Sequence, residues 1–254
     1  MKSIIKDIIF FILNSIATPD SKARILMYHS VGDNKAFFTV KAVQFERHLA
    51  YLAKNNFKVV FLSELIQKIK NKEPLEKMVC LTFDDGYYDN YKEVFPLLQK
   101  YKMPATIFLP TGFIGKEFMT SNGVRLVIMF KEHVQEMHES GLVEFMPHTK
   151  RHIDLGSELH NDAILDIESS RKDIRELIGT DAGILAYPKG KYTSDIVAYL
   201  QKNNWRGAVT VEEGSVDHTS DVYLLKRNSI DSSTSFIQFK GKVTGVVDMY
   251  QGLK

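Results

Sequence analysis

Two pairs of side chains in the sequence have the types and spacing needed for hydrolytic chemistry. Asp84 and Asp85 are adjacent, and His148 and His152 lie four residues apart later in the chain. Two histidines and one carboxylate fill three positions of a tetrahedral zinc site and leave the fourth for water. Such a metal lowers the pKa of its water to about 7, and a second carboxylate can accept the proton. The combination suits hydrolysis of an unreactive bond such as an amide.

Each motif alone also has a purely structural explanation. Asp-Asp-Gly after a strand often forms a turn, and histidines at this spacing are common on helix surfaces. Here Pro147 sets His148 at the exit of an expected strand, and one helical turn would place the ring of His152 on the same side. The two motifs together, at consistent positions, favour a metal site.

Apolar β-rich runs alternate with helical patterns from residue 24 onward, which predicts a parallel sheet covered by helices. The expected strands are 24–28, 57–61, 78–83, 105–109, 143–146, 183–186, 207–211 and 223–225. The expected helices are 43–55, 64–70 (capped by Ser63), 90–101, 127–140, 161–178, 194–203 and 234–241. The length of 254 residues is close to the ~250 typical of one α/β barrel, so we expect a single-domain, distorted (β/α) barrel of about seven to eight strands.

In such barrels the active site forms at the carboxyl ends of the strands. The candidate residues of this chain fall at those ends: His29, Asp84, Asp85, His148, Tyr187, Pro188 and Arg227. The long loop 111–125 contains several glycines, and we expect it to border the substrate groove.

The charge balance gives no indication of a nucleic-acid partner. The chain has 33 basic and 31 acidic residues, well mixed, with a net charge of +2. Nucleic-acid binding usually requires a basic run or stripe, and none is present. The single cysteine, Cys80, lies in an apolar run and is expected to be a small buried hydrophobic residue.

The N-terminal segment, residues 1–20, is expected to form an apolar or amphipathic helix that precedes the barrel at 21–254. Its apolar run is shorter than the roughly 20 residues that a transmembrane helix needs. The helix could pack on the barrel, or residues 1–17 could lie on a membrane surface. A signal peptide is the third interpretation, because Lys2 and Lys6 precede the run and a small-residue pattern follows it.

At its two polar motifs the chain resembles the polysaccharide deacetylases of carbohydrate esterase family 4, which carry the NodB-homology domain. Residues 82–86 read TFDDG and residues 148–152 match H-[ST]-x-x-H. Residues 186–190, AYPKG, are similar to a third motif that usually reads R-x-P-x-G. The resemblance spans about residues 24–230.

Two further segments resemble one subgroup of this family. Residues 25–29 read ILMYH and residues 225–227 read LKR, as in enzymes that deacetylate poly-N-acetylglucosamine and related bacterial exopolysaccharides. The resemblance implies metal-dependent removal of N-acetyl groups from hexosamine units, with release of acetate. By position it implies one divalent metal on Asp85, His148 and His152. Zinc is the default for these ligands, and cobalt, nickel or iron could also fill the site.

The resemblance also implies roles for the neighbouring residues. Asp84 corresponds to the general base, and the backbone N–H of Tyr87 to a donor for the developing oxyanion. Tyr187 and Pro188 correspond to residues that line the sugar pocket.

The chain departs from the family pattern at two places. Ala186 stands where the third motif usually has its arginine, and we expect Arg227 to replace it as the charge that keeps Asp84 ionised. The usual Leu-x-His motif near the C-terminus is absent, so His29 is the candidate acid for the leaving amine. A structural histidine that holds a loop is the alternative for His29.

Two other functions stay open at this point. The substrate could be a lipid-linked or nucleotide-linked N-acetyl sugar at the membrane, which suits the apolar N-terminal helix. The protein could instead be a non-catalytic, metal-bearing glycan-binding relative, because the motif-three arginine and the late histidine are missing. We expect a cytoplasmic protein at the membrane periphery, with export as the alternative.

Overall fold

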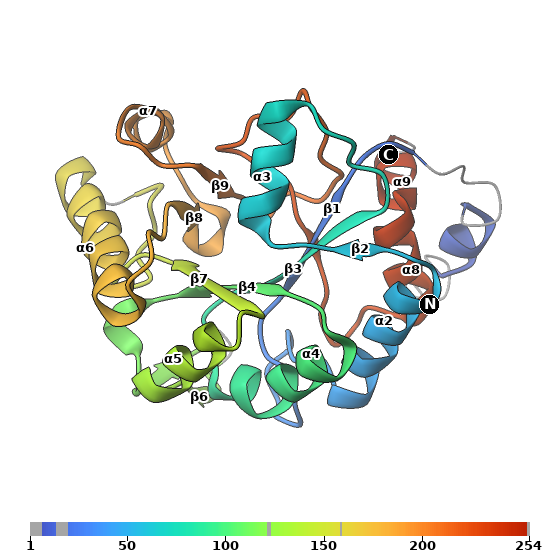
Figure 1. The fold of residues 1–254 in the computed structure, drawn as a ribbon, viewed down its shortest axis with the longest axis horizontal. Coiled ribbons are helices and arrows are strands. Elements are labelled where there is room, and N and C mark those ends of the chain that lie inside the picture. Colours follow the sequence, from blue (N-terminus) through green and yellow to red (C-terminus); the bar gives the residue numbers. More distant parts are fainter. Residues whose placement is uncertain (1–6, 14–19, 121–122, 158, 253–254) are drawn as a thin grey trace.

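A parallel β-sheet forms the centre of the molecule, and helices surround it (Figure 1). The computed structural model describes residues 7–13, 20–120, 123–157 and 159–252. The main sheet has six strands, in the order β10-β1-β3-β4-β7 with β2 paired to β3. Their bounds are β1 Arg24–Tyr28, β2 Lys58–Val59, β3 Met78–Phe83, β4 Ala105–Leu109, β7 Val143–Pro147 and β10 Asn228–Ser229.

Two more parallel strands, β8 (Ile184–Ala186) and β9 (Gly207–Val209), form a separate pair. The described residues therefore form eight parallel strands, six in the main sheet and two in this pair, which agrees with the expected seven to eight. Among the described residues no ladder joins β7 to β8, and only an isolated bridge, Val209 to Leu225, continues beyond β9. The expected α/β class with a parallel sheet is confirmed, and the ring of strands is interrupted rather than closed.

The strand residues explain why the sheet is central. Every residue of β1, β3 and β4 is buried, as expected for parallel strands that are covered on both faces. The covering helices each bury one apolar stripe, for example Phe45, Leu49 and Leu52 of α2. These helices are α2 Ala42–Lys54, α3 Leu62–Asn71, α4 Phe95–Tyr101, α5 Lys131–Glu139, α6 His160–Ile178, α7 Ser194–Lys202, α8 Phe236–Thr244 and α9 Val246–Gly252.

The region between β4 and α5 differs from the expectation. A helix from residue 127 is wrong, because β6 (Arg125–Val127) pairs with β5 (Glu117–Met119) in an antiparallel hairpin. The expected helix 90–101 is a π-helical turn at Asn90–Val94 followed by α4. Pro96 explains this change, because it lacks the N–H that a regular helix would use at that position.

The C-terminal region also differs in two ways. The expected strand 223–225 is wrong, because Leu225 makes only an isolated bridge and the last strand, β10, begins after Arg227. Helix α9 was not predicted.

The expected cap of α3 is also wrong. Helix α3 begins after Phe61, and Ser63 instead donates to the carboxylate of Glu144 on β7 through its N–H and Oγ.

The described part of the N-terminal helix, residues 7–13, lies against the C-terminal helices. Phe10 and Leu13 pack on Val246 of α9, and Asp7 accepts hydrogen bonds from Ser235 and Gln238 at the start of α8. Ile8 and Ile12 of the same helix are exposed. No helix in the described part of the chain is long and apolar enough to cross a membrane. The rest of the expected helix, residues 1–6 and 14–19, lies outside the described residues.

Candidate metal centre and active site

The turn after β3 places two carboxylates at the carboxyl end of the sheet. The N–H of Asp84 donates to the carbonyl of Tyr28 at 2.9 Å, so Asp84 still belongs to the sheet edge. Asp85 then turns the chain with φ 69°, and Gly86 follows with φ 60°. A Cβ on Gly86 would lie 2.2 Å from Cδ2 of Leu109, so this turn requires glycine in both conformation and space.

Asp85, His148 and His152 come together as a candidate metal site. Their ligand atoms all lie within 4.8 Å of one another. Nε2 of His148 is 3.8 Å from Oδ1 of Asp85, and Nε2 of His152 is 3.4 Å from it. Oδ2 of Asp85 accepts a hydrogen bond from the hydroxyl of Tyr87 at 2.7 Å. Oδ1 is buried with no hydrogen-bond partner among the described residues, which is the state expected of a metal ligand.

The backbone sets the orientation of His148. Its Nδ1 lies 2.9 Å from the carbonyl oxygen of Ala186. A carbonyl can only accept, so Nδ1 carries a proton and Nε2 is the ring nitrogen that faces Asp85. Contacts of this kind fix the tautomer of metal-binding histidines.

A strained loop, and not the expected helical turn, brings His152 to His148. Thr149 and His152 have φ of 60° and 54°, and the two imidazole rings are 4.8 Å apart. The Asp166 carboxylate on α6 holds the loop by accepting the N–H groups of Lys150 and Arg151, at 2.7 and 2.9 Å. The sequence contained no signal for Asp166, because its role depends on how α6 packs.

The protonation state of His152 suits metal binding. Burial, followed by the neighbouring His148, lowers the pKa of His152 to about 4, against the opposing effect of Asp85. The imidazole is therefore neutral at neutral pH and can donate a lone pair.

Asp84 does not join the three ligands but pairs with Arg227, as expected. Nη1 and Nη2 of Arg227 donate to its two oxygens at 2.6 and 2.8 Å, and Nε donates to the carbonyl of Thr210 at 2.8 Å. The Arg227 side chain is completely buried. Burial by itself raises the pKa of Asp84, but the charge of Arg227 outweighs it and holds that pKa well below its usual range. Asp84 is therefore ionised.

Tyr87 and His29 lie beside these carboxylates. The Tyr87 ring is buried and stacks on Phe38 with centroids 5.7 Å apart. Burial and the nearby Asp85 charge raise the pKa of Tyr87, so its hydroxyl remains a donor. The ring of His29 stacks on the same Phe38, with centroids 5.0 Å apart. The charge of His29 contributes to the lowered pKa of Asp84. The roles of both residues in the reaction stay predictions.

Tyr187 and Pro188 follow β8 and are both buried. The hydroxyl of Tyr187 donates to the carbonyl of Tyr223 at 3.0 Å, and its ring packs against Tyr192 at 4.6 Å. Their contact with a sugar stays a prediction. Phe118 was not singled out from the sequence, yet its ring lies 5.2 Å from that of His152. It belongs to the loop expected at the groove, now seen as the β5–β6 hairpin.

The fold and the site together define a class: an α/β protein with a two-histidine, one-carboxylate cluster and a separate ionised aspartate, which suits metal-assisted hydrolysis. Residues 71–208 match the family model described as polysaccharide deacetylase. YxkH of Bacillus subtilis strain 168 is 30% identical over 217 residues, which cover 85% of this chain and 74% of YxkH.

Two further proteins agree with this assignment. A poly-β-1,6-N-acetyl-D-glucosamine N-deacetylase of Staphylococcus aureus strain MSSA476 is 30% identical over 206 residues, 75% of this chain and 67% of the relative. The solved structure of the deacetylase PplD of Streptococcus pyogenes in complex with acetate superposes with a TM-score of 0.77 and 25% identity, covering 89% of this chain and 99% of PplD. This chain belongs to the polysaccharide deacetylase family and is a hydrolase of N-acetyl amides.

Proposed function

We propose that the protein removes N-acetyl groups from N-acetylhexosamine units of a bacterial polysaccharide or glycan precursor by metal-dependent hydrolysis. The observation that carries the proposal is the division of labour between the adjacent aspartates. Asp85 turns an unpaired oxygen towards two histidines, while Asp84 is held ionised by Arg227. The S. aureus relative, which is named for a poly-N-acetylglucosamine substrate, supports the choice of polymer.

The residues present fit a divalent metal. The orphaned Oδ1 of Asp85 and the Nε2 atoms of His148 and His152 form a compact set of donors. Zinc suits two imidazoles and one carboxylate, and cobalt, nickel or iron are the alternatives. When bound, the metal supplies Lewis acidity to the acetamide carbonyl and to water.

The protein's own residues supply the proton transfers. Asp84, kept ionised by Arg227, accepts the proton of the attacking water. The backbone N–H of Tyr87 donates to the oxyanion that forms on the former carbonyl oxygen. His29 donates a proton to the amine as the C–N bond breaks, so that acetate and a free amino sugar leave the site.

Acetate release from N-acetylglucosamine oligomers tests this proposal. The purified protein is stripped of metal with a chelator and then given zinc or cobalt. We expect no release from the stripped protein and restored release at one equivalent of metal. Metal bound at one equivalent without acetate release would contradict the proposed function.

One observation favours a second candidate substrate, a lipid-linked or nucleotide-linked N-acetyl sugar at the membrane. Ile8, Phe11 and Ile12 of the N-terminal helix are 54%, 64% and 54% exposed, whereas Phe10 and Leu13 of the same helix are buried against Val246. An apolar helix face of this kind suits contact with a membrane surface, and would place the enzyme at the periphery of the cytoplasmic membrane.

Serine at these three positions should abolish sedimentation with vesicles of phosphatidylglycerol and phosphatidylethanolamine. It should leave hydrolysis of a soluble oligomer intact, because the helix packs through its other side. Unchanged sedimentation would argue against membrane contact.

A further inference from the structure

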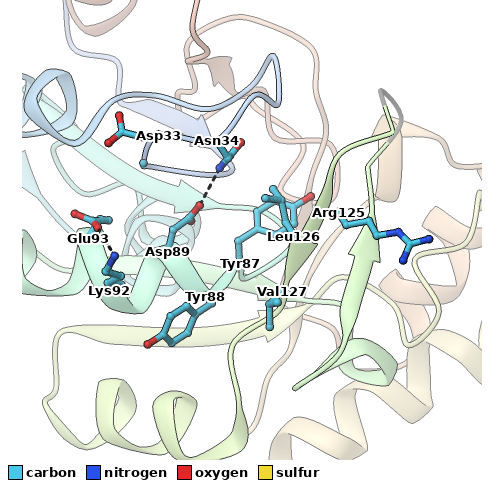
Figure 2. Close-up of a pocket in the computed structure, with 11 residues that line it drawn as sticks. Asp33, Asn34, Tyr87, Tyr88, Asp89, Lys92, Glu93, Arg125, Leu126 and Val127 are labelled. Atoms are coloured by element: carbon cyan, nitrogen blue, oxygen red, sulfur yellow. Dashed lines mark hydrogen bonds and ion pairs between the residues drawn. The ribbon is translucent and has the colours of Figure 1, made fainter.

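A cavity of about 380 Å³ lies beside Tyr87, and none of the candidate metal ligands lines it. Figure 2 shows the side chains that line this cavity. Three segments line it: the loop 32–34, residues between Tyr87 and Glu93, and strand β6. The volume lies within the range of pockets that bind small ligands. Of the residues assigned to the reaction, only Tyr87 lines this cavity.

The cavity and the metal centre share a wall. Tyr87 lines the cavity, and its hydroxyl donates to Asp85 at 2.7 Å. In the β5–β6 hairpin, Leu126 lines the cavity and pairs directly with Phe118, whose ring lies 5.2 Å from that of His152. Residues paired in this way lie on the same face, about 5 Å apart. A chain held at the metal centre therefore has a short path into the cavity.

One side of the cavity is polar and firmly held. Asp89 accepts hydrogen bonds from Ser30 Oγ at 2.5 Å, from the N–H of Val31 at 3.3 Å and from Nδ2 of Asn34 at 3.3 Å. These bonds hold the loop that carries Asp33 and Asn34 against Asp89, and Figure 2 marks the bond between Asn34 and Asp89. The pocket is therefore built before a ligand arrives.

Of the three carboxylates that line the cavity, Asp33, Asp89 and Glu93, only Glu93 has an ion-pair partner among the described residues. Nζ of Lys92 forms an ion pair with Oε1 of Glu93 at 3.5 Å, and Nη1 of Arg125 forms one with Oε2 of Glu117 at 3.5 Å. Asp33 is exposed and forms no ion pair with any described residue. The lining therefore disfavours an anionic ligand and favours one with hydroxyl or ammonium groups.

Aromatic rings continue from the cavity onto the surface. Tyr88 lines it and is 37% exposed, and Phe130 beyond it is 41% exposed. The His133 ring lies between them, 5.1 Å from Tyr88 and 5.6 Å from Phe130, and stacks on Tyr91 at 4.2 Å. Exposed rings that neighbours hold in place offer a rigid apolar surface at little entropic cost.

We propose that this cavity is a subsite for the hexosamine unit next to the one whose acetamide reacts, with a preference for a unit that carries a free amine. The ring of Tyr88 packs against the apolar face of the sugar, and the carboxylate of Asp33 pairs with the ammonium group. The subsite deepens the proposed function, on which it rests, by making an already deacetylated neighbour a favourable feature of the substrate.

Calorimetric binding of a β-1,6-linked glucosamine tetramer to the full chain with zinc tests the subsite without requiring turnover. Tyr88→Ala should weaken binding about three- to tenfold, as loss of one ring contact predicts. Asp33→Asn should weaken it about two- to fivefold and reduce its salt dependence. Tyr88→Phe, which keeps the ring, should bind like the wild type. Glu76→Gln removes an exposed carboxylate before β3 and serves as the charge control.

Wild-type affinity in both Tyr88→Ala and Asp33→Asn, or no tetramer binding by the wild type, would overturn the subsite. The two proposals fail separately. Tetramer binding that depends on Tyr88 and Asp33, without acetate release from acetylated oligomers, would remove the proposed function and leave the subsite. Acetate release by the wild type, together with unaltered tetramer binding in the variants, would remove the subsite and leave the proposed function.

Discussion

The pair formed by Asp84 and Arg227 shows how one residue's environment decides its chemistry. Asp84 and Asp85 are adjacent and both buried, yet only Asp84 has each oxygen bound by a guanidinium, at 2.6 and 2.8 Å. Arg227 supplies the charge that faces Asp84, where Ala186 can supply none. The sequence prediction for Arg227 rested on a strand at 223–225 that the structure does not contain. Arg227 instead directly precedes β10, which pairs with β1.

Arg227→Met tests whether the guanidinium keeps Asp84 ionised. The variant leaves a buried carboxylate without its partner, so we expect the pKa of Asp84 to rise and the free energy of unfolding to fall by about 3–5 kcal/mol. Arg227→Lys keeps the charge but cannot form both bonds, and should be intermediate. Urea unfolding and the pH dependence of acetate release measure the two effects. Equal stability and an unchanged pH profile in Arg227→Met would refute this role.

The residues that hold the ligands were harder to predict than the ligands. Asp85, His148 and His152 were predicted from motif spacing, and the structure brings them together. Asp166 and the carbonyl of Ala186 position the histidines through contacts between distant elements. Those contacts follow from packing, which residue spacing does not report.

At the scale of elements, the turn between β3 and the π-helical segment positions both aspartates. Gly86→Ala tests it, because Gly86 combines φ 60° with a Cβ position 2.2 Å from Leu109. We expect a loss of about 2 kcal/mol or more, together with weaker metal binding, from strain and overpacking. Gly141→Ala is the matched control, since Gly141 has φ 71° but nothing within 4 Å of its Cβ position. Equal losses of stability and of metal binding in the two variants would contradict the close packing of Gly86 against Leu109 as a cause.

Helix α2 is joined to β1 and α8 through His48. His48 is buried, lies 3.1 Å from the hydroxyl of Tyr28 and stacks on Phe239 at 3.8 Å. Burial, followed by the charge of Arg47, lowers its pKa to about 3 from 6.5. The folded state thus keeps His48 neutral where the unfolded chain binds a proton.

His48→Phe should change the pH dependence of stability. In the wild type His48 contributes a loss of stability as the pH falls from 6.5 towards about 3, because only the unfolded state gains the proton in that window. His48→Phe should therefore lose less stability than the wild type between pH 6.5 and 5, measured by urea unfolding. His218→Phe, at an exposed loop position, is the control. Parallel curves for wild type and His48→Phe would contradict the buried neutral state.

The main elements could be predicted, and the exceptions have physical causes. Long apolar runs predicted β1, β3, β4 and β7 because parallel strands are buried on both faces. The β5–β6 hairpin was not predicted, since its strands are only three residues each and partly exposed. Such short strands form through their neighbours rather than through a pattern of their own.

At the scale of the whole molecule, the three candidate metal ligands come from segments that follow different strands, β3 and β7. Metal should therefore stabilise the whole fold. Added zinc at about 100 times its dissociation constant should contribute about 2.7 kcal/mol, seen as a higher midpoint of thermal unfolding. The triple variant Asp85→Ala, His148→Ala, His152→Ala should show no such shift. An equal shift in that variant would place the metal elsewhere.

The most direct test of the account is the effect of Asp84→Asn on metal content and acetate release measured in the same sample. Asn keeps the shape of Asp84 but cannot accept a proton from water. We predict one equivalent of bound zinc, as in the wild type, and acetate release from N-acetylglucosamine oligomers reduced about 10²- to 10⁴-fold. Release at the wild-type rate with zinc bound would contradict the assignment of Asp84 as the base.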